Sequence, residues 1–382
     1  MATSNTLTGL IPTLYEAMDR VSRELVGFIP ASERFSSPDR VAKDQVVRVP
    51  IAESGDLESI TPGATPAASG GTVLDYADIK ITKSYAAPIL WSGEEQLSVG
   101  EYGQYDEILA RQFTSGMRKL TNQIEKDLAA EAKVSASRAY GTAGSTPFGS
   151  ANDLSDIAKV RQILDDNGAP QDDLQLVIGS AAMANMRGKQ SVLFKVNEAG
   201  SSDMLRNGLT DRLQGFALRN SGGIVVHTGG TGSADTVSGA HDIGDTVVAV
   251  SAFADGDYLP GDIVTIGNHK YVVLSANHTS NEITIGEPGL RETLTNGDTI
   301  TLLADYTPNI AMARSALILA ARAPAAPEGG DSADDVMFVT DPMSGLPFEV
   351  RVYRQYRQVK YEIAMAWGVS GIKPAHTAVL VG

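Results

Sequence analysis

Residues 105–134 of the chain, YDEILARQFTSGMRKLTNQIEKDLAAEAKV, determine much of its architecture. Apolar residues recur there at spacings of three and four, which places them on one stripe of an amphipathic helix. The stripe consists of Leu109, Phe113, Met117, Leu120, Ile124 and Leu128. Charged residues, including Glu125 and Glu131, lie mostly off it. At a rise of about 1.5 Å per residue this helix is about 45 Å long, a natural backbone for an elongated subunit.

Upstream of the helix the sequence predicts a long two-stranded flap. Strand-like runs at 46–51 and 73–82 flank an acidic span, 53–71, that is rich in Gly, Pro, Ser and Ala. The flap has too few large apolar residues for its own core, and an isolated hairpin is only marginally stable in water. It is therefore either a loose surface loop or a segment that contacts another subunit.

A second amphipathic helix is predicted near the N-terminus. Leu10, Leu14, Met18, Val21, Leu25 and Phe28 recur at spacings of four and three. This pattern predicts a helix from about Thr8 to Phe28, which Pro30 should end.

Downstream of residue 134 the chain predicts mixed α and β structure. A helix should run from an N-cap at Asp153 or Ser155 to a stop at Gly168. A buried strand at 174–178 and a short helix at 181–187 follow. Nearer the C-terminus lie an apolar segment at 309–321, a turn at 341–345 and an alternating run at 348–363.

Between these parts, residues 244–303 predict a small all-β barrel or sandwich. The β-rich runs are 246–251, 263–266, 271–274, 282–285 and 299–303. The turn pairs between them are Asp255-Gly256, Pro260-Gly261, Gly267-Asn268, Pro288-Gly289 and Asn296-Gly297. Each Gly supplies the positive φ that a tight reversal needs, and five strands suffice for a small barrel.

Composition limits the possible functions. The 382 residues fit two or three domains, and 46 acidic against 31 basic residues give a net charge of -15. This balance opposes dedicated nucleic-acid binding, which needs clustered Lys and Arg. A local basic group fits a solvated face or a subunit contact better. It comprises Arg351, Arg354, Arg357 and Lys360.

Cellular location is restricted by what the sequence lacks. There are no cysteines, so disulfides and thiolate chemistry are excluded. The N-terminus has no signal-peptide pattern, and Arg314 and Arg322 interrupt the most apolar stretch, 310–326. That stretch falls short of a membrane span, so a soluble intracellular protein without membrane contact is expected.

No catalytic, cofactor-binding or metal site is predicted. The loop 229–232 lacks the following helix of a dinucleotide site, and 368–371 is out of register for a nucleophile elbow. The acidic doublets 94–95, 165–166 and 172–173 fit helix capping and solvation. None of the histidines forms a ligand-type pair, so surface or turn positions are expected. They are His227, His241, His269, His278 and His376.

Three segments carry a resemblance to a known family. They are 91–97 continuing into 118–125, the segment 261–267, and 363–369 followed by Lys373-Pro374. In type and order they resemble the major capsid (coat) proteins of tailed bacteriophages with the Hong Kong 97-type capsid fold. The likeness is greatest to the coat proteins of the short-tailed Salmonella phage type, in which a β-barrel domain is inserted into the body. The resemblance spans nearly the whole chain and implies an α+β fold.

The resemblance also implies a division of the chain. Residues 1–35 would be the N-arm helix, 36–90 the extended E-loop, and 91–137 the spine helix region. Residues 138–227 and 305–382 would form the peripheral and axial body, and 228–304 the inserted β-barrel domain.

By the same resemblance the chain is a structural protein, not an enzyme, and needs no cofactor. It would form pentamers and hexamers of a head shell that encloses double-stranded DNA without reading its sequence. The implied partners are a separate scaffolding protein, a portal protein and a decoration protein. The shell would assemble in the bacterial host cytoplasm and remain in the virion. The alternatives are an encapsulin-like compartment shell and a glycan-binding protein with a platform of Phe253, Tyr258 and Tyr271.

Candidate subunit-contact residues lie on the arm and the flap. They are Glu16, Asp19, Arg20, Arg48, Glu53 and Lys83. Charged side chains on segments without a core of their own are expected to meet a neighbouring copy.

Overall fold

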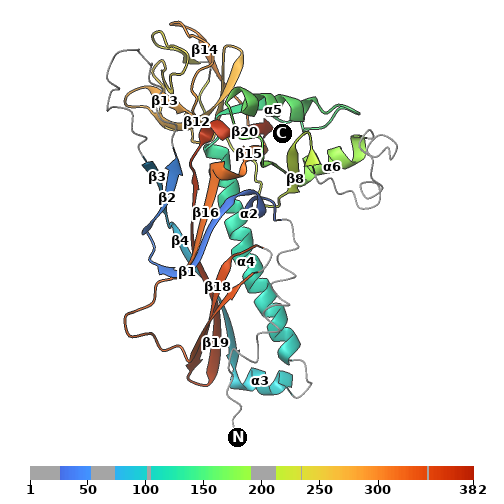
Figure 1. The fold of residues 1–382 in the computed structure, drawn as a ribbon, viewed down its shortest axis with the longest axis vertical. Helices are drawn as coiled ribbons and strands as arrows, with labels where there is room; N and C mark the ends of the chain where they lie inside the picture. Colours follow the sequence, from blue (N-terminus) through green and yellow to red (C-terminus); the bar gives the residue numbers. More distant parts are fainter. Residues whose placement is uncertain (1–25, 53–73, 101–104, 191–211, 234, 342–343) are drawn as a thin grey trace, which may run out of the picture.

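The computed structural model describes residues 26–52, 74–100, 105–190, 212–233, 235–341 and 344–382 (Figure 1). The predicted N-terminal helix lies outside this part of the chain, except at its end. There a separate single turn, α2 (Phe28–Ala31), contains Pro30. The expectation that Pro30 ends a helix is therefore wrong. Proline is tolerated in a first turn because the N–H groups there have no helical partner.

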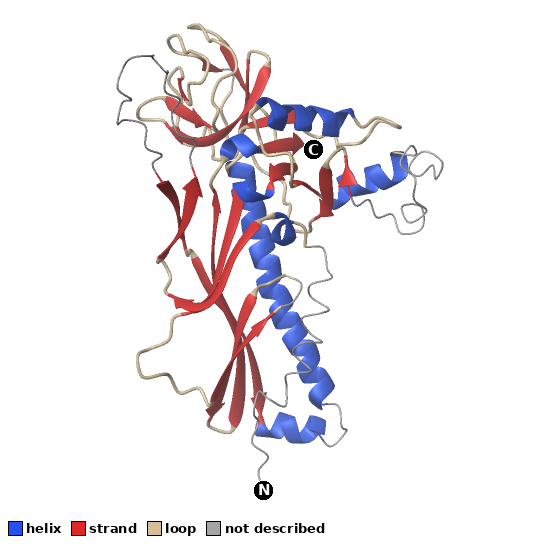
Figure 2. Ribbon diagram, in the orientation of Figure 1, coloured by secondary structure: helices blue, strands red, loops and turns tan. Residues whose placement is uncertain are grey.

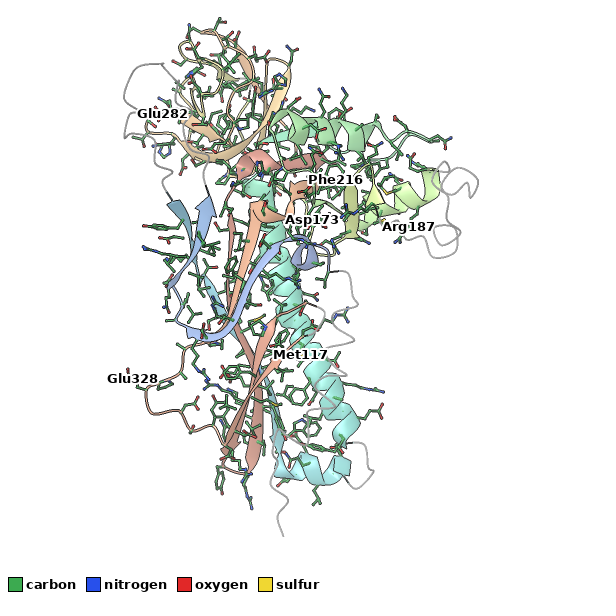
Figure 3. The ribbon with its side chains drawn as sticks, viewed as in Figure 1. Met117, Asp173, Arg187, Phe216, Glu282 and Glu328 are labelled. Atoms are coloured by element: carbon green, nitrogen blue, oxygen red, sulfur yellow. The ribbon has the colours of Figure 1, made fainter. Side chains whose placement is uncertain are left out.

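The long helix is confirmed as α4 (Tyr105–Val134). Its predicted apolar stripe is buried against β4 (Lys83–Ser92) and β19 (Gln358–Gly371), as the position of Met117 illustrates (Figure 3). The short helix α3 (Gly93–Gly100) precedes it at the far end of the molecule from the β-module (Figure 2). Glu125, which the spacing places off the apolar stripe, is buried as well.

A six-stranded sheet lies along α4. In order it contains β1 (Glu33–Val41), β16 (Leu317–Pro324), β19, β18 (Pro347–Gln355) and β17 (Asp335–Thr340), with β4 also paired to β19. Only β1 and β16 are parallel; the other pairs are antiparallel. The largest core cluster lies between this sheet and α4 and includes Phe113, Tyr361 and Trp367.

A second sheet runs from the body into the β-module. Its order is β7 (Arg212–Leu213), β8 (Phe216–Asn220), β6 (Leu174–Ile178), β15 (Pro308–Ala313), β20 (Thr377–Val381), β5 (Arg138–Gly141), β12 (His269–Asn277), β11 (Ile263–Ile266), β14 (Thr299–Leu302) and β9 (Asp235–Thr236). Helix α5 (Ser155–Asp166) packs on β20 and β5, and α6 (Ser180–Lys189) follows β6. The body and module parts of the sheet meet at one residue pair, Tyr271 with Arg138.

The five predicted strands of the β-module are confirmed, with β10 (Val247–Ala249) and β13 (Glu282–Ile285) completing the set. All five predicted turn glycines have positive φ, from 58° to 97°. The module has its own apolar cluster, centred on residues such as Ile266, Ile283 and Tyr271. Closure into a barrel stays a prediction.

The flap is confirmed as a separate two-stranded sheet. β2 (Val46–Ala52) pairs antiparallel with β3 (Leu74–Lys80). The flanking strands β1 and β4 each overlap one end of the predicted 36–90 range, but they belong to the six-stranded sheet.

Other predictions were right in kind but wrong in detail. Helix α5 begins at Ser155, but its N-cap is Leu154, while the Asp153 carboxylate accepts the Ser155 N–H at 2.9 Å. The apolar segment 309–321 is two strands separated by a 3-10 turn (Arg314–Ala316). The alternating run 348–363 is a hairpin that reverses at Tyr356-Arg357, where Arg357 has φ 56°. No helix among the described residues is long and apolar enough to cross a membrane.

Candidate functional site

The flap exposes one face and buries the other. Val49 and Ile79 pack against Ile318 of β16 in a small apolar cluster. Val46 and Tyr76 remain exposed. Alternate residues of a strand point to opposite faces, so one face of the flap is seated on the body and the other is open to a partner.

Arg48 lies on this flap beside its own strand partners. Its Nε donates to Asp78 Oδ1 at 3.1 Å, and its guanidinium lies 4.3 Å from the centre of the Tyr76 ring. The Arg48 side chain is 65% exposed. An exposed pair of this kind contributes at most about 1 kcal/mol, so it orients the side chain more than it stabilises the subunit.

Lys83 is engaged within the subunit. Its Nζ lies 2.5 Å from Asp127 Oδ1, which also accepts from Gln123 at 2.9 Å. The other oxygen of Asp127 accepts from Trp367 Nε1 at 2.9 Å. Lys83 therefore ties β4 to α4. Glu16, Asp19, Arg20 and Glu53 lie outside the described residues, and the contact roles of all six residues stay predictions.

A second exposed apolar region lies at the far end of the molecule. A capping box starts α3: Ser92 N–H donates to Glu95 Oε2 at 2.9 Å, and Glu95 N–H donates to Ser92 Oγ at 3.2 Å. Leu97 on this helix and Tyr356 at the β18–β19 turn are 75% and 90% exposed. A groove of about 720 Å³ lies between the two elements.

Arg354 and Arg357, for which a subunit contact is one of two expectations from the sequence, line this groove, but Leu97 and Tyr356 were not singled out from the sequence. The usable signal was an aromatic residue at a turn between charged strands, because large exposed apolar groups gather where proteins meet.

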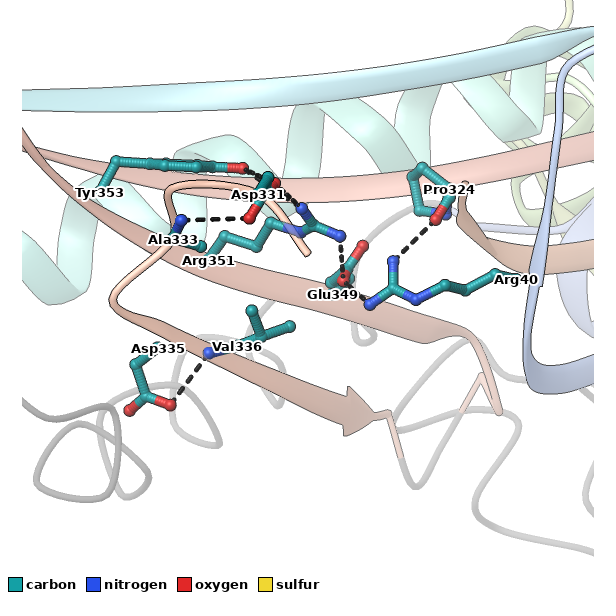
Figure 4. Close-up of polar contacts among 9 residues, drawn as sticks. All are labelled: Arg40, Pro324, Asp331, Ala333, Asp335, Val336, Glu349, Arg351 and Tyr353. Atoms are coloured by element: carbon teal, nitrogen blue, oxygen red, sulfur yellow. Dashed lines mark hydrogen bonds and ion pairs between the residues drawn. The ribbon is translucent and has the colours of Figure 1, made fainter. Parts of the chain in front are cut away.

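A buried charge cluster fixes the loop before β17 (Figure 4). Glu349, which is 1% exposed, accepts from Arg40 at 2.6 Å and pairs with Arg351 at 2.9 Å. Arg351 also pairs with Asp331, and the Tyr353 hydroxyl donates to Asp331 at 2.9 Å. Burial alone would lower the pKa of Arg351, but its hydrogen bonds with Tyr353 and Glu349 outweigh that and raise it. The cluster joins β1, β18 and the loop.

The predicted solvated basic face is therefore wrong at Arg351, which is buried. Arg354 pairs with Asp334 at 2.6 Å, and Lys360 pairs with Glu362 at 2.5 Å. Acidic partners accompany three of the four basic residues, so this hairpin does not present a phosphate-binding surface.

The β-module is fixed to the end of α4 through His227. Lys133 Nζ lies 2.8 Å from His227 Nδ1, and His227 Nε2 lies 2.7 Å from Asp262 Oδ1. An ammonium can only donate, so Nδ1 accepts and Nε2 carries the proton that Asp262 accepts. Burial lowers the pKa of Lys133, while Asp262 opposes this. The prediction of a surface histidine is wrong here, because His227 is buried.

Glu125 anchors the chain where the N-terminal segment enters the body. Its carboxylate accepts the N–H groups of Gly27 at 2.6 Å, Phe28 at 2.7 Å and Ile29 at 3.1 Å. It also accepts from Ser221 Oγ at 2.6 Å. Burial raises the pKa of Glu125, and these hydrogen bonds oppose that shift. The carboxylate caps α2 in place of a side chain from α2 itself.

The structure gives little support to other kinds of site. No cluster of His, Asp and Glu among the described residues could hold a metal ion. In the 229–232 loop, Gly229 N–H donates to Asp305 and Gly230 N–H donates to Asp262, so acidic groups already bind these amides. The glycan platform is wrong, because Tyr258 and Tyr271 are buried.

Residues 95–288, just over half of the chain, match the family model described as P22 coat protein, gene protein 5. No curated protein sequence matches the chain. Among solved structures, a chain of Mycobacterium phage Che8 is 13% identical, with 88% of this chain and 85% of that chain covered and a TM-score of 0.44. The acid-stable capsid of Helicobacter pylori bacteriophage KHP30 is 12% identical, with 93% and 88% covered and a TM-score of 0.45. These values are low, so the family assignment rests on the sequence match.

Proposed function

This chain belongs to the P22 coat protein family, and on that premise we propose that its copies form pentamers and hexamers of an icosahedral head shell around packaged double-stranded DNA. The chain is a shell-forming major capsid protein with the mixed α and β architecture of the Hong Kong 97-type capsid fold. The family match over residues 95–288 carries this proposal.

The flap supports the proposal physically. It buries Val49 and Ile79 on its own subunit but leaves Val46, Tyr76 and Arg48 exposed. A repeated contact between such a face and a different face of the next copy closes into a ring when the rotation allows. Many interfaces of ordinary size, about 1,200–2,000 Å² each, can then hold a durable shell.

The proposed division of the chain keeps the predicted boundaries. Residues 1–35 form the arm, 36–90 the E-loop, 91–137 the spine region, and 138–227 with 305–382 the body. Residues 228–304 form the inserted domain, which helps the subunit fold or braces its neighbours. The separate apolar cluster of that domain is what such a role requires.

The proposed partners follow from family membership. A separate scaffolding protein would guide assembly, a portal protein would occupy one vertex, and a decoration protein would bind the finished shell. Assembly would take place in the cytoplasm of the bacterial host, and the protein would have a structural role without enzymatic activity. The net charge of -15 suits a wall that lets DNA pack and leave.

Electron microscopy of the full chain, expressed with and without neighbouring phage genes, tests the proposal. Closed shells that depend on those genes and enclose DNA are expected. Shells that enclose enzymes would favour an encapsulin-like compartment, and a monomer under every condition would contradict both. Light scattering across a salt series adds a second test. Because copies of like charge repel, assembly should respond to ionic strength.

A further inference from the structure

A crevice of about 430 Å³ lies at the seam between the β-module and the body. The wall on the body side comes from β5 and α5, and the wall on the module side comes from the start of β12. Figure 1 shows α5 and β12 at the end of the molecule where the module sits. Apart from the strand pair of Tyr271 with Arg138, the contacts described above lie outside this crevice.

Cationic side chains from three separate elements line it. Arg138 comes from β5, Lys159 from α5 and Lys270 from β12, while Asp166 is its acidic lining residue. Nearby Glu292 is bound to Asn268, whose backbone N–H donates to it at 2.7 Å. The crevice therefore has a local excess of positive charge, whereas the whole chain has a net charge of -15.

The charge of Arg138 is poorly compensated. Its side chain is 6% exposed, and its contact with Asp166 Oδ2 is long, at 3.4 Å. The same nitrogen, Nη2, also donates to two neutral acceptors, Asn167 Oδ1 at 3.2 Å and Ile163 O at 3.3 Å, while Nε has no hydrogen-bond partner among the described residues. Burial lowers the pKa of Arg138, Asp166 opposes this, and Arg291 lowers it further. A buried cation with incomplete partners is costly, and an anion would offset that cost.

Lys270 is in a similar position. Its Nζ donates to the carbonyl of Gly141, a neutral acceptor, and burial lowers its pKa. Lys159 is exposed, and its Nζ donates to Gln162 Oε1 at 3.3 Å as its one hydrogen bond within the described part of the chain. Both ammonium groups therefore have donors left for a ligand, since each carries three.

We propose that this crevice binds an oxyanion of the phosphate class and that the bound anion clamps the β-module to the body. A tetrahedral oxyanion offers enough acceptors for donors from three directions, and a guanidinium recognises it well. Since the three cations come from β5, α5 and β12, the ligand links the body of the subunit to the module.

Isothermal titration of the full-length subunit with sodium phosphate tests this site, with sodium chloride at equal ionic strength as reference. Saturable phosphate binding is expected. Replacing Lys159→Gln and Lys270→Gln together should weaken it about a hundredfold or more, since each lost charged hydrogen bond costs about tenfold. Lys126→Gln on the exposed side of α4 is the matched control and should bind as the unaltered chain does.

Thermal unfolding in chloride checks that the double variant folds; if it does not, Lys159→Gln alone replaces it. Phosphate also stabilises proteins non-specifically. That effect does not saturate with phosphate concentration, and it would raise the unfolding temperatures of the double variant and of the Lys126→Gln control equally. The proposal would be overturned if the double variant bound phosphate as tightly as the control, or if phosphate gave the same titration as chloride. A short thymidine oligonucleotide distinguishes the source of the phosphate group. If the oligonucleotide competes with inorganic phosphate, the site takes a DNA phosphodiester. If it does not compete, the site takes free phosphate.

Discussion

The β-module and the flap are both β structures that project from the same body, yet they are stabilised in different ways. The module surrounds its own apolar cluster, in which Ile266, Ile283 and Tyr271 are fully buried. In the described strands of the flap, β2 and β3, the buried apolar residues belong to a cluster shared with Ile318 of the body sheet. The module can therefore hold its shape by itself, whereas the shape of the flap depends on what lies beneath and beside it.

Removing the module gives the largest expected effect. Excision of residues 228–304 with a short Gly/Ser bridge should lower subunit solubility and change shell size. Ile263 and Val272 of the module belong to the main core cluster, so their loss uncovers apolar surface. The soluble fraction and sedimentation of the assembled product measure this. Normal shells at normal yield would mean that the module is dispensable to the body.

Breaking the buried charge cluster should loosen the base of the flap and leave the module intact. Glu349→Ala leaves Arg40 and Arg351 without their shared partner and should cost about 3–5 kcal/mol. Hydrogen exchange should rise in β1 and β2 but not in β11. Exposed Glu328, on the projecting loop in Figure 3, gives the control Glu328→Ala. Faster exchange in β11 would show that the two regions are coupled.

Shortening one apolar side chain in each region tests whether that region has a core of its own. Ile283→Ala in the module should reduce the free energy of unfolding by about 2–5 kcal/mol, because it leaves a cavity in a packed interior. Val46→Ala on the open face of the flap should change it by less than about 0.5 kcal/mol. Urea denaturation measures both. Similar losses in the two variants would remove the distinction between the regions.

The last prediction concerns Arg48, where the effect on assembly should exceed the small effect on stability. Arg48→Ala removes one exposed ion pair and one ring contact, together at most about 1–2 kcal/mol. Its effect should appear in assembly, where light scattering should show slower growth. Arg111→Ala removes a comparable exposed pair on α4 and is the control. If both variants assemble like the unaltered chain, Arg48 is not a contact residue.

Local patterns predicted much of the fold. The α4 stripe and the turn glycines of the module were correct because helix periodicity and positive φ are properties of neighbouring residues. The flap strands were correct for the same reason.

The burial that the sequence did not predict occurs where partners are distant in sequence. Glu125 is buried where the backbone N–H groups of Gly27 and Phe28 bind its carboxylate, and Arg351 is buried where it pairs with Asp331 of the loop before β17 (Figure 4). No spacing within α4 or β18 contains that information. His227 was likewise assigned to the surface, since its partner on α4 is almost a hundred positions away.

The two ends of the module meet at a single bridge, with His227 N–H donating to Tyr306 O at 2.8 Å and Tyr306 N–H donating to His227 O at 3.2 Å. An inserted segment whose two ends join the body at adjacent points can be replaced by another domain whose termini are also close together. The bridge is thus a graft point on every copy of the subunit. A foreign domain placed there would be displayed once per copy, provided that it covers Lys133 and Tyr306.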